Sequence, residues 1–204
     1  YVVTKVARFP FDKFSDASNK LGTQMKATGE VMSIGRTMEE SLLKAMRSLE
    51  TGVCHIYHKK FDDWTNDRLL EYIAEPTDDR LYAIAQLIRG GVDLVLIYNR
   101  TKIDMFFLEK FKNIVEFERV VEAAPMDIEV LREAKRMGFS DKFIGQLWGV
   151  SQHDMYLLRE KNGIFPVYKM IDTCASEFSS YVPYFYSTYE DENESLVSDK
   201  EKIV

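Results

Sequence analysis

The stretch Gly29-Glu30-Val31-Met32-Ser33-Ile34-Gly35-Arg36-Thr37 separates two kinds of sequence. Before it, β-branched and apolar residues form short extended runs, with a first run at residues 1–6 and a second inside the stretch at residues 30–34. After it, apolar residues recur at helical spacing through most of the remaining chain. Thr37 is the first good helix cap, and Glu40 three residues later completes the pattern of a capping box. An extended ending therefore meets a helical domain here.

The bulk composition suits a globular protein of one moderate domain with extensions, or of two small domains. The chain has 204 residues, of which 46% are hydrophobic, and a formal net charge of −6. An acidic balance argues against a dedicated nucleic-acid binder, which needs positive charge. No apolar run approaches the ~20 residues of a membrane span, and no signal peptide is visible. Two cysteines, Cys54 and Cys174, form no disulfide framework, so we expect a reducing, cytoplasmic setting.

Both ends of the sequence are informative. The chain opens in a β-rich run without an initiator Met and closes on Ile203-Val204, where a new strand would begin. We therefore expect an internal piece of a larger protein. Because two short strands are not stable alone in water, we expect the partners of residues 1–6 and 30–34 to lie upstream.

The pattern predicts an all-α fold: an irregular array of short helices around one long helix, with short extended segments at the N-terminus and an irregular C-terminal linker. The long helix should begin at Thr101, with Asp104 completing a capping box, and end before Pro125. Its expected buried stripe is Ile103, Phe106, Phe107, Phe111, Ile114, Val115 and Val121. The other predicted helices cover residues 37–52, 66–74, 77–89, 127–137, 140–148 and 151–161.

Three segments fit no clear helical pattern. Residues 92–98 could be a strand, but their helical surroundings favour a short helix. Residues 165–170 look extended, and residues 181–189 are rich in aromatics that would dock a linker on another domain. Residues 190–201 are acidic and polar, and are typical of a linker.

Candidate chemistry is sparse. Cys54, His55 and His58 have the ligand types of a zinc site, but three ligands in one loop fall short of a structural site, so a chance cluster is favoured. Cys174 has no neighbouring histidine to activate it, so a structural thiol is favoured. Gly90-Gly91 follows a helix, where a C-cap explains it better than a phosphate loop.

The main alternative function is a helix-turn-helix module centred on residues 140–163. Its second helix would present Ser151, Gln152, His153 and Tyr156 to DNA. Phosphate binding requires a local excess of positive charge, whereas Lys, Arg, Asp and Glu balance across residues 127–163. An α-hairpin packed in a core is therefore favoured.

Three separated blocks resemble the carbamoyl-phosphate synthase large subunit. The first is Thr23-Gln24-Met25-Lys26-Ala27-Thr28 continuing into the stretch 29–37, which resembles the close of the family's first ATP-grasp unit. The second is Pro166-Val167-Tyr168-Lys169-Met170-Ile171-Asp172-Thr173-Cys174-Ala175-Ser176-Glu177-Phe178, and the third is Tyr186-Ser187-Thr188-Tyr189-Glu190. Both resemble the link into the family's second half.

The resemblance implies a domain layout. Residues 1–24 would be the tail of the carboxyphosphate-forming ATP-grasp half, residues 25–168 the helical oligomerisation (connection) domain, and residues 169–204 the linker into the second half. The parent would be a glutamine-hydrolysing, ATP-dependent ligase that makes carbamoyl phosphate from bicarbonate, glutamine-derived ammonia and two ATP, for pyrimidine and arginine biosynthesis.

The resemblance also implies what lies elsewhere. The family's ATP and Mg (or Mn) sites lie in the bodies of the ATP-grasp halves, and a small glutaminase subunit supplies ammonia. We therefore expect no catalytic, cofactor-binding or metal residue within this chain, and no activity from it alone. Its expected partners are the two ATP-grasp halves, the glutaminase within the parent, and a second copy, with no nucleic acid and no membrane.

Overall fold

The computed structural model describes residues 1–11, 13–14, 16–174, 177–178 and 184–195. Over these residues the chain is mostly helical, with two small antiparallel sheets, so the expectation of a strictly all-α fold was wrong. The elements in chain order are β1 Val2–Arg8, β2 Gly29–Gly35, α1 Met38–Ser48, the 3-10 turn η1 Lys59–Phe61, α2 Asn66–Tyr72, α3 Arg80–Arg89, α4 Leu94–Thr101, α5 Met105–Ala123, α6 Ile128–Arg136, α7 Asp141–Trp148, α8 Gln152–Lys161, β3 Val167–Ile171 and β4 Tyr184–Thr188.

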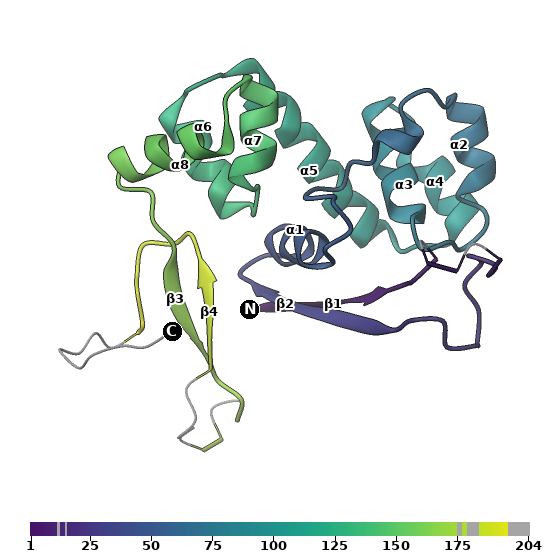
Figure 1. Cartoon of the computed structure of the whole chain (residues 1–204), viewed down its shortest axis with the longest axis horizontal. Helices are drawn as coiled ribbons and strands as arrows, with labels where there is room; N and C mark the ends of the chain where they lie inside the picture. The colour runs from purple at the N-terminus through teal and green to yellow at the C-terminus, as the bar shows by residue number, and fades with distance from the viewer. Residues whose placement is uncertain (12, 15, 175–176, 179–183, 196–204) are drawn as a thin grey trace.

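The helices form two groups joined by α5. Figure 1 shows α2, α3 and α4 at one end of the long helix and α6, α7 and α8 at the other, with α1 between the helices and the β1–β2 hairpin. The core contains buried side chains from every helix, including Leu43, Ile84, Leu108, Ile114 and Ile144, and Val6 and Val31 of the hairpin pack against it. The prediction of short helices around one long helix is confirmed, as is the short helix expected near residues 92–98.

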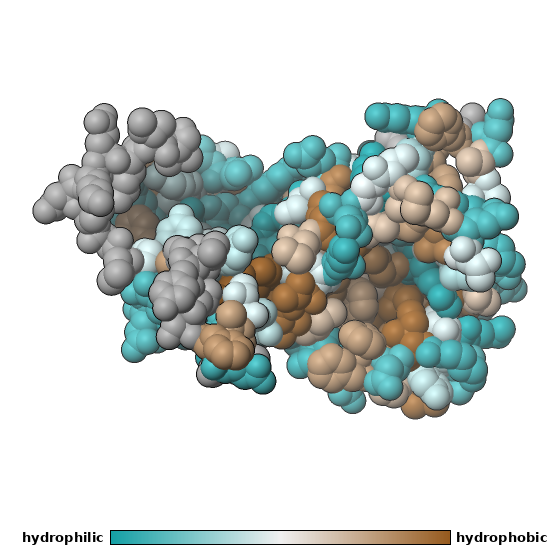
Figure 2. All heavy atoms as spheres, turned by 90° about the horizontal axis from the view of Figure 1, so that it is seen from below, coloured by the Kyte–Doolittle hydropathy of each residue, from teal (hydrophilic) through white to brown (hydrophobic). Residues whose placement is uncertain are grey.

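The two N-terminal strands pair with each other. Val2 lies opposite Gly35 and Arg8 opposite Gly29, so no partner from upstream is needed to form the ladder. Thr4 and Ser33 point inward and are buried beneath α1, whereas Val3 and Met32 point outward and are exposed. The expectation that the partners of these strands lie upstream was wrong for this ladder, because the two strands pair with each other and pack on α1. Figure 2 shows apolar side chains exposed over the middle of this lower face, where the hairpin lies.

The long helix begins later than the sequence pattern suggested. Thr101 is the last residue of α4, where its hydroxyl donates to the carbonyl of Ile97, and Asp104 alone caps α5 by accepting from the N–H of Phe106. The predicted capping box between Thr101 and Asp104 does not form. Phe106 and Phe107 fall on the exposed side of the first turn, and Leu108 is buried instead. The core stripe is otherwise as expected at Phe111, Ile114, Val115 and Val121.

The C-terminal segment is more regular than a linker. The extended run expected at residues 165–170 is confirmed as β3, and it pairs antiparallel with β4 so that Val167 lies opposite Thr188. Among the aromatic residues of the 181–189 run, Tyr184, Phe185 and Tyr186 belong to β4. Tyr181 and the second half of the expected linker, residues 196–201, lie outside the described residues.

Candidate functional site: the junction of helices and strands

The junction begins at the first turn of α1. The N-cap Thr37 accepts a hydrogen bond from the N–H of Glu40 at 3.2 Å, as the capping box predicts. The Glu40 carboxylate, however, accepts from the N–H of Arg36 at 2.6 Å, one residue before the cap. Glu40 is only 1% exposed. A buried carboxylate therefore holds the chain where β2 turns into α1.

Lys44, one helical turn further along α1, contacts both β2 and β4. Its ammonium lies 2.6 Å from the other oxygen of Glu40. It donates to the carbonyl of Ile34 in β2 at 2.8 Å and to the carbonyl of Ser187 in β4. The ammonium also lies 5.6 Å from the centre of the Tyr186 ring. Burial lowers the pKa of Lys44, and the hydrogen bond and charge of Glu40 oppose that shift. The contacts of Lys44 link α1, β2 and β4.

Two glycines allow α1 to sit this close to its neighbours. A Cβ at Gly35 would lie 2.8 Å from the amide nitrogen of Ser41, and a Cβ at Gly138 would lie 2.8 Å from the Cα of Glu40. Gly138 also has a φ of +95°, which side chains rarely adopt. Its carbonyl accepts from Arg47 of α1 at 2.8 Å. Helix α1 therefore packs closely against both β2 and the turn after α6.

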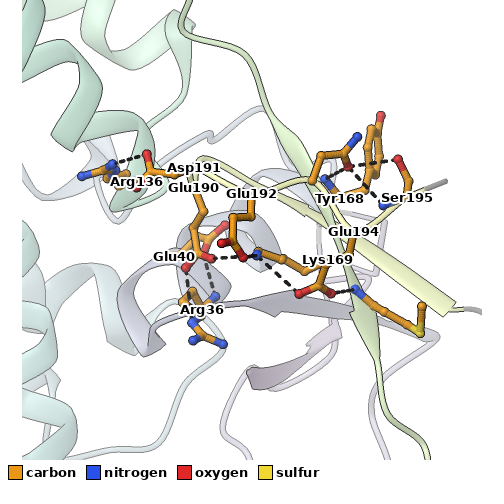
Figure 3. Close-up of polar contacts among 12 residues, drawn as sticks. Arg36, Glu40, Arg136, Tyr168, Lys169, Glu190, Asp191, Glu192, Glu194 and Ser195 are labelled. Atoms are coloured by element: carbon orange, nitrogen blue, oxygen red, sulfur yellow. Dashed lines mark hydrogen bonds and ion pairs between the residues drawn. The ribbon is translucent and has the colours of Figure 1, made fainter. Parts of the chain in front are cut away.

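The acidic segment after β4, residues 190–194, contacts basic side chains of β3, of α6 and of the turn that precedes α1 (Figure 3). Lys169 of β3 is nearly buried, and its ammonium faces three glutamates of the segment at 3.4–3.8 Å. Arg36 pairs with Glu190 at 3.2 Å, and Arg136 of α6 pairs with Asp191 at 3.0 Å. The charge run that the sequence predicts as linker is therefore held against the helical domain as far as residue 194.

Backbone bonds fix the same segment to β3. The Glu194 carboxylate accepts from the N–H of Met170 at 2.7 Å, and this bond lowers the pKa of Glu194. The Glu194 N–H in turn donates to the carbonyl of Tyr168 at 2.8 Å. Because Asn193 also accepts from the N–H of Tyr168, the exposed edge of β3 is covered by its own chain.

Tyr189 connects the hairpin to the three helices at the far end of α5. Its ring lies 5.0 Å from the ammonium of Lys135 and 5.6 Å from the guanidinium of Arg159. Asp141 holds both cations, at 2.8 Å from Lys135 and 3.0 Å from Arg159. Burial lowers the pKa of Lys135 to about 8. The ring of Tyr189 therefore packs on a buried ion cluster that consists of Lys135, Asp141 and Arg159.

A groove of about 900 Å³ runs across this junction, over the N-terminus of α1. Its lining carries both signs of charge. Each of its basic residues in the described part of the chain already pairs with a carboxylate of the same chain; these residues are Arg36, Lys110, Arg136 and Lys169. Internal ion pairs therefore cross the groove and connect the segments that line it.

The loop that contains Cys54, His55 and His58 does not bring these candidate zinc ligands together around one point. His55 is fully buried, with its Nε2 2.9 Å from Glu118, and its ring stacks on Phe143 with centroids 3.7 Å apart. His58 instead caps η1 by accepting from the N–H of Lys60. Among the described residues, no group of three or more His, Cys, Asp or Glu side chains could hold a metal ion.

The pair of His55 and Glu118 was missed by sequence reasoning. Arg89 completes it, with two guanidinium nitrogens each 2.7 Å from the Glu118 carboxylate. The three residues come from a loop, α5 and the end of α3, so no local spacing reveals them. The one signal in the sequence is Glu118, a charged residue beside the apolar stripe predicted for the long helix, because a buried charge needs a partner.

The remaining sequence candidates lie apart from the junction. Gly91 has a φ of +76° directly after α3, as a C-cap requires, and Cys174 lies in the turn after β3, with its sulfur 3.8 Å from the Thr173 hydroxyl. In the helix pair α7–α8, the side chains suggested for DNA are exposed: Ser151, Gln152, His153 and Tyr156. Two cations counted there, Lys135 and Arg159, are buried against Asp141, which leaves less charge for phosphate than the sequence count implies.

A comparison with known protein families identifies the helical part. The family model described as carbamoyl-phosphate synthetase large chain, oligomerisation domain, matches residues 30–163. The chain belongs to this family. The match starts in β2 and ends directly after α8, so the oligomerisation domain comprises the whole helical array together with the strand that enters it. Among the described residues, no helix is long and apolar enough to cross a membrane.

Proposed function

We propose that this chain is the structural connection between the two ATP-grasp halves of a carbamoyl-phosphate synthase large subunit. Residues 25–168 are the oligomerisation domain, residues 1–24 the tail of the carboxyphosphate-forming half, and residues 169–204 the linker to the second half. The observation that carries the proposal is the Lys44 contact, because one half-buried side chain of α1 bonds β2, the strand that enters the domain, and β4, which pairs with the strand that leaves it.

The parent reaction explains why such a connection is useful. A synthase that makes carbamoyl phosphate from bicarbonate, glutamine-derived ammonia and two ATP must pass a labile intermediate between its halves. Misplacing reacting groups by about 1 Å can lower a rate by a factor of a hundred. The Mg (or Mn) and ATP sites belong to the halves, and a small glutaminase subunit supplies ammonia. The setting is cytoplasmic, in pyrimidine and arginine biosynthesis, and the domain also associates with a second copy.

The connection is tested by loosening it in the intact synthase. Lys44→Met removes the ammonium and keeps most of the side-chain volume. We expect more ATP to be consumed for each carbamoyl phosphate formed, because the intermediate is lost to water when the halves are out of register. Lys112→Met, at an exposed ion pair of α5, is the matched control. An unchanged ratio of ATP to product in the Lys44 variant would refute a role for this contact.

The chain by itself is expected to be inactive. The basic residues of the junction groove each pair with a carboxylate of the same chain, as described above, which weakens their attraction for phosphates. Purified chain should therefore turn over no ATP above a buffer blank, with bicarbonate and ammonia present. Turnover that scales with the amount of chain and survives repeated purification would overturn this part of the proposal.

A further inference from the structure

A cavity of about 600 Å³ lies between the end of β1, the last turn of α1 and the first turn of α3. Figure 1 shows the end of β1 beside the group formed by α2, α3 and α4. Most of the side chains that line the cavity are apolar, among them Val6 of β1, Met46 of α1, Leu81 of α3 and Phe111 of α5. Among the described residues, none lines both this cavity and the junction groove. Its volume and its apolar lining are those of a small-molecule site.

The segment between β1 and β2 forms one wall of this cavity. The N–H of Leu21, a lining residue, donates to the carbonyl of Pro76 at 2.6 Å. The preceding residue, Lys20, pairs with Glu75 and forms an isolated β-bridge with Thr77. The wall is therefore fixed to the turn between α2 and α3.

Two neighbouring aspartates in front of α3 have different surroundings. Asp79 accepts hydrogen bonds from Tyr72 at 2.5 Å and from Thr77 at 3.0 Å, and it pairs with Lys60 at 2.5 Å. Asp78 lines the cavity and is half-buried, but among the described residues it has no ion pair. Burial raises the pKa of Asp78, the charge of Asp79 adds to this shift, and the opposing effect of Lys60 is smaller. One of the two carboxylates is thus paired within the chain and the other is not.

The guanidinium of Arg80 does not neutralise Asp78. Its Nε donates to the carbonyl of Ile73 at 2.7 Å and its Nη2 to the carbonyl of Thr101 at 3.5 Å, at the ends of α2 and α4. Burial lowers the pKa of Arg80, and the charge of Glu75, rather than that of Asp78, opposes the shift. An ionised carboxylate beside an apolar cavity is costly without a counter-charge, and such a group in a cleft is typical of a functional site.

We propose that this cavity binds a small organic cation, with a primary ammonium group at Asp78 and an apolar body against Met46, Leu81 and Phe111. The rings of Tyr82 and Phe111 line the cavity as well, and the faces of aromatic rings attract cations. The site is independent of the proposed connection, because it shares no described lining residue with the junction groove. The failure of either proposal therefore leaves the other intact.

Three probes with the same apolar body separate the effect of charge from that of the cavity. They are phenylbutylammonium, phenylbutanol and phenylbutyrate, titrated into the purified chain and followed by calorimetry. Phenylbutylammonium should bind with a dissociation constant of about 1 mM or below. The alcohol should bind at least about tenfold more weakly, and phenylbutyrate more weakly still, because its charge has the sign of Asp78. In nuclear magnetic resonance spectra, the amide signals of Leu81 and Phe111 should shift with the ammonium probe, and those of α8 should not.

Asp78→Asn removes the charge and keeps the shape of the side chain. This variant should bind phenylbutylammonium at least about tenfold more weakly than wild type and no better than it binds the alcohol. Its thermal stability should not fall, because the carboxylate has no cation to lose. Asp63→Asn, at an exposed turn before α2, makes the same charge change away from the cavity and should bind like wild type.

Each outcome decides the proposal. No binding of phenylbutylammonium at 10 mM, equal affinity for the ammonium and the alcohol, or unchanged affinity in Asp78→Asn would overturn it. A loss in Asp63→Asn as large as in Asp78→Asn would overturn it too, because the probe would then follow the acidic surface as a whole. If Asp78→Asn does not fold, the three probes and the map of shifted amides in the wild-type chain still decide.

Discussion

Gly138 is the residue at which backbone geometry matters most for the junction. Its positive φ disfavours any side chain, and a Cβ there would meet the backbone of α1. Gly149 has a similar φ of +70° but open space around it. Gly149→Ala should therefore cost about 1 kcal/mol from the strained backbone alone, whereas Gly138→Ala should cost at least about 3 kcal/mol, because α1 must also move.

Denaturant unfolding of the two variants measures this difference. The slope against denaturant should stay near wild type in both, so that the midpoints compare stability directly. Equal losses in the two variants would mean that α1 does not approach Gly138 as closely as the structure has it.

His55 makes the stability of the domain sensitive to acid. Burial lowers its pKa, against the opposing effect of Glu118, so the folded chain keeps the ring neutral while the unfolded chain takes up a proton near pH 6.5. The free energy of unfolding is then at its full value above about pH 7 and falls as the pH drops through 6.5, by up to about 1.4 kcal/mol per pH unit.

His55→Gln provides the comparison, because its amide can still donate to Glu118 but does not titrate. Its free energy of unfolding should change less between pH 7.5 and 5.5 than that of wild type, as measured by urea unfolding at each pH. Two curves with the same slope would show that His55 is not the group responsible.

Local sequence signals predicted the residues whose roles are local. Thr37 accepts the N–H of Glu40 as the sequence predicts, and Ser140 and Ser151, the first residues of two predicted helices, likewise accept a backbone N–H. A cap depends only on the next three residues. The prediction of Thr101 as the N-cap of the long helix was wrong for a local reason. Asp104 caps this helix instead, and aspartate is at least as strong an N-cap as threonine.

At the scale of elements, helices were easier to predict than the pairing of strands. The periodicity of α1, α3 and α6 to α8 marks where they lie, since each buries one face. The pairing of β1 with β2 and of β3 with β4 joins segments separated by long loops, and no short-range turn signal announces it. Phe106 and Phe107 show the limit of periodicity, because both are exposed in the first turn of α5 although the pattern predicts them in the core.

The C-terminal hairpin depends on α1 for its order. Lys44→Met removes the donor that links the carbonyls of Ile34 and Ser187, so the hairpin loses this direct contact with α1 and β2. We expect amide protons of β3 and β4 to exchange at least about tenfold faster in this variant, while those of α2 and α3 stay as in wild type.

Hydrogen exchange followed by mass spectrometry reads both regions in one experiment. Lys112→Met, which removes an exposed Lys of α5, should leave β3 and β4 protected. If the hairpin keeps its protection in Lys44→Met, then Lys169 and Tyr189 are sufficient to hold it.

At the scale of the whole molecule, the resemblance of three sequence blocks identified the family before any geometry was known, and the family match over residues 30–163 agrees with it. The junction itself could not be predicted. Lys44 and Ser187 are 143 residues apart, and Lys169 meets a glutamate run that, by composition alone, is typical of a solvated linker. Such contacts arise only when tertiary packing brings distant segments together.

We expect the β3–β4 hairpin and the helices to form one rigid unit, and a distance between the two is the decisive measurement. Spin labels at Glu160→Cys on α8 and Phe185→Cys on β4, in a chain carrying Cys54→Ser and Cys174→Ser, allow that distance to be measured by pulsed electron paramagnetic resonance. The structure predicts a single narrow distance distribution in the wild-type background and a broader one after Lys44→Met. A broad distribution in the wild-type background would contradict a connection that holds two halves in register.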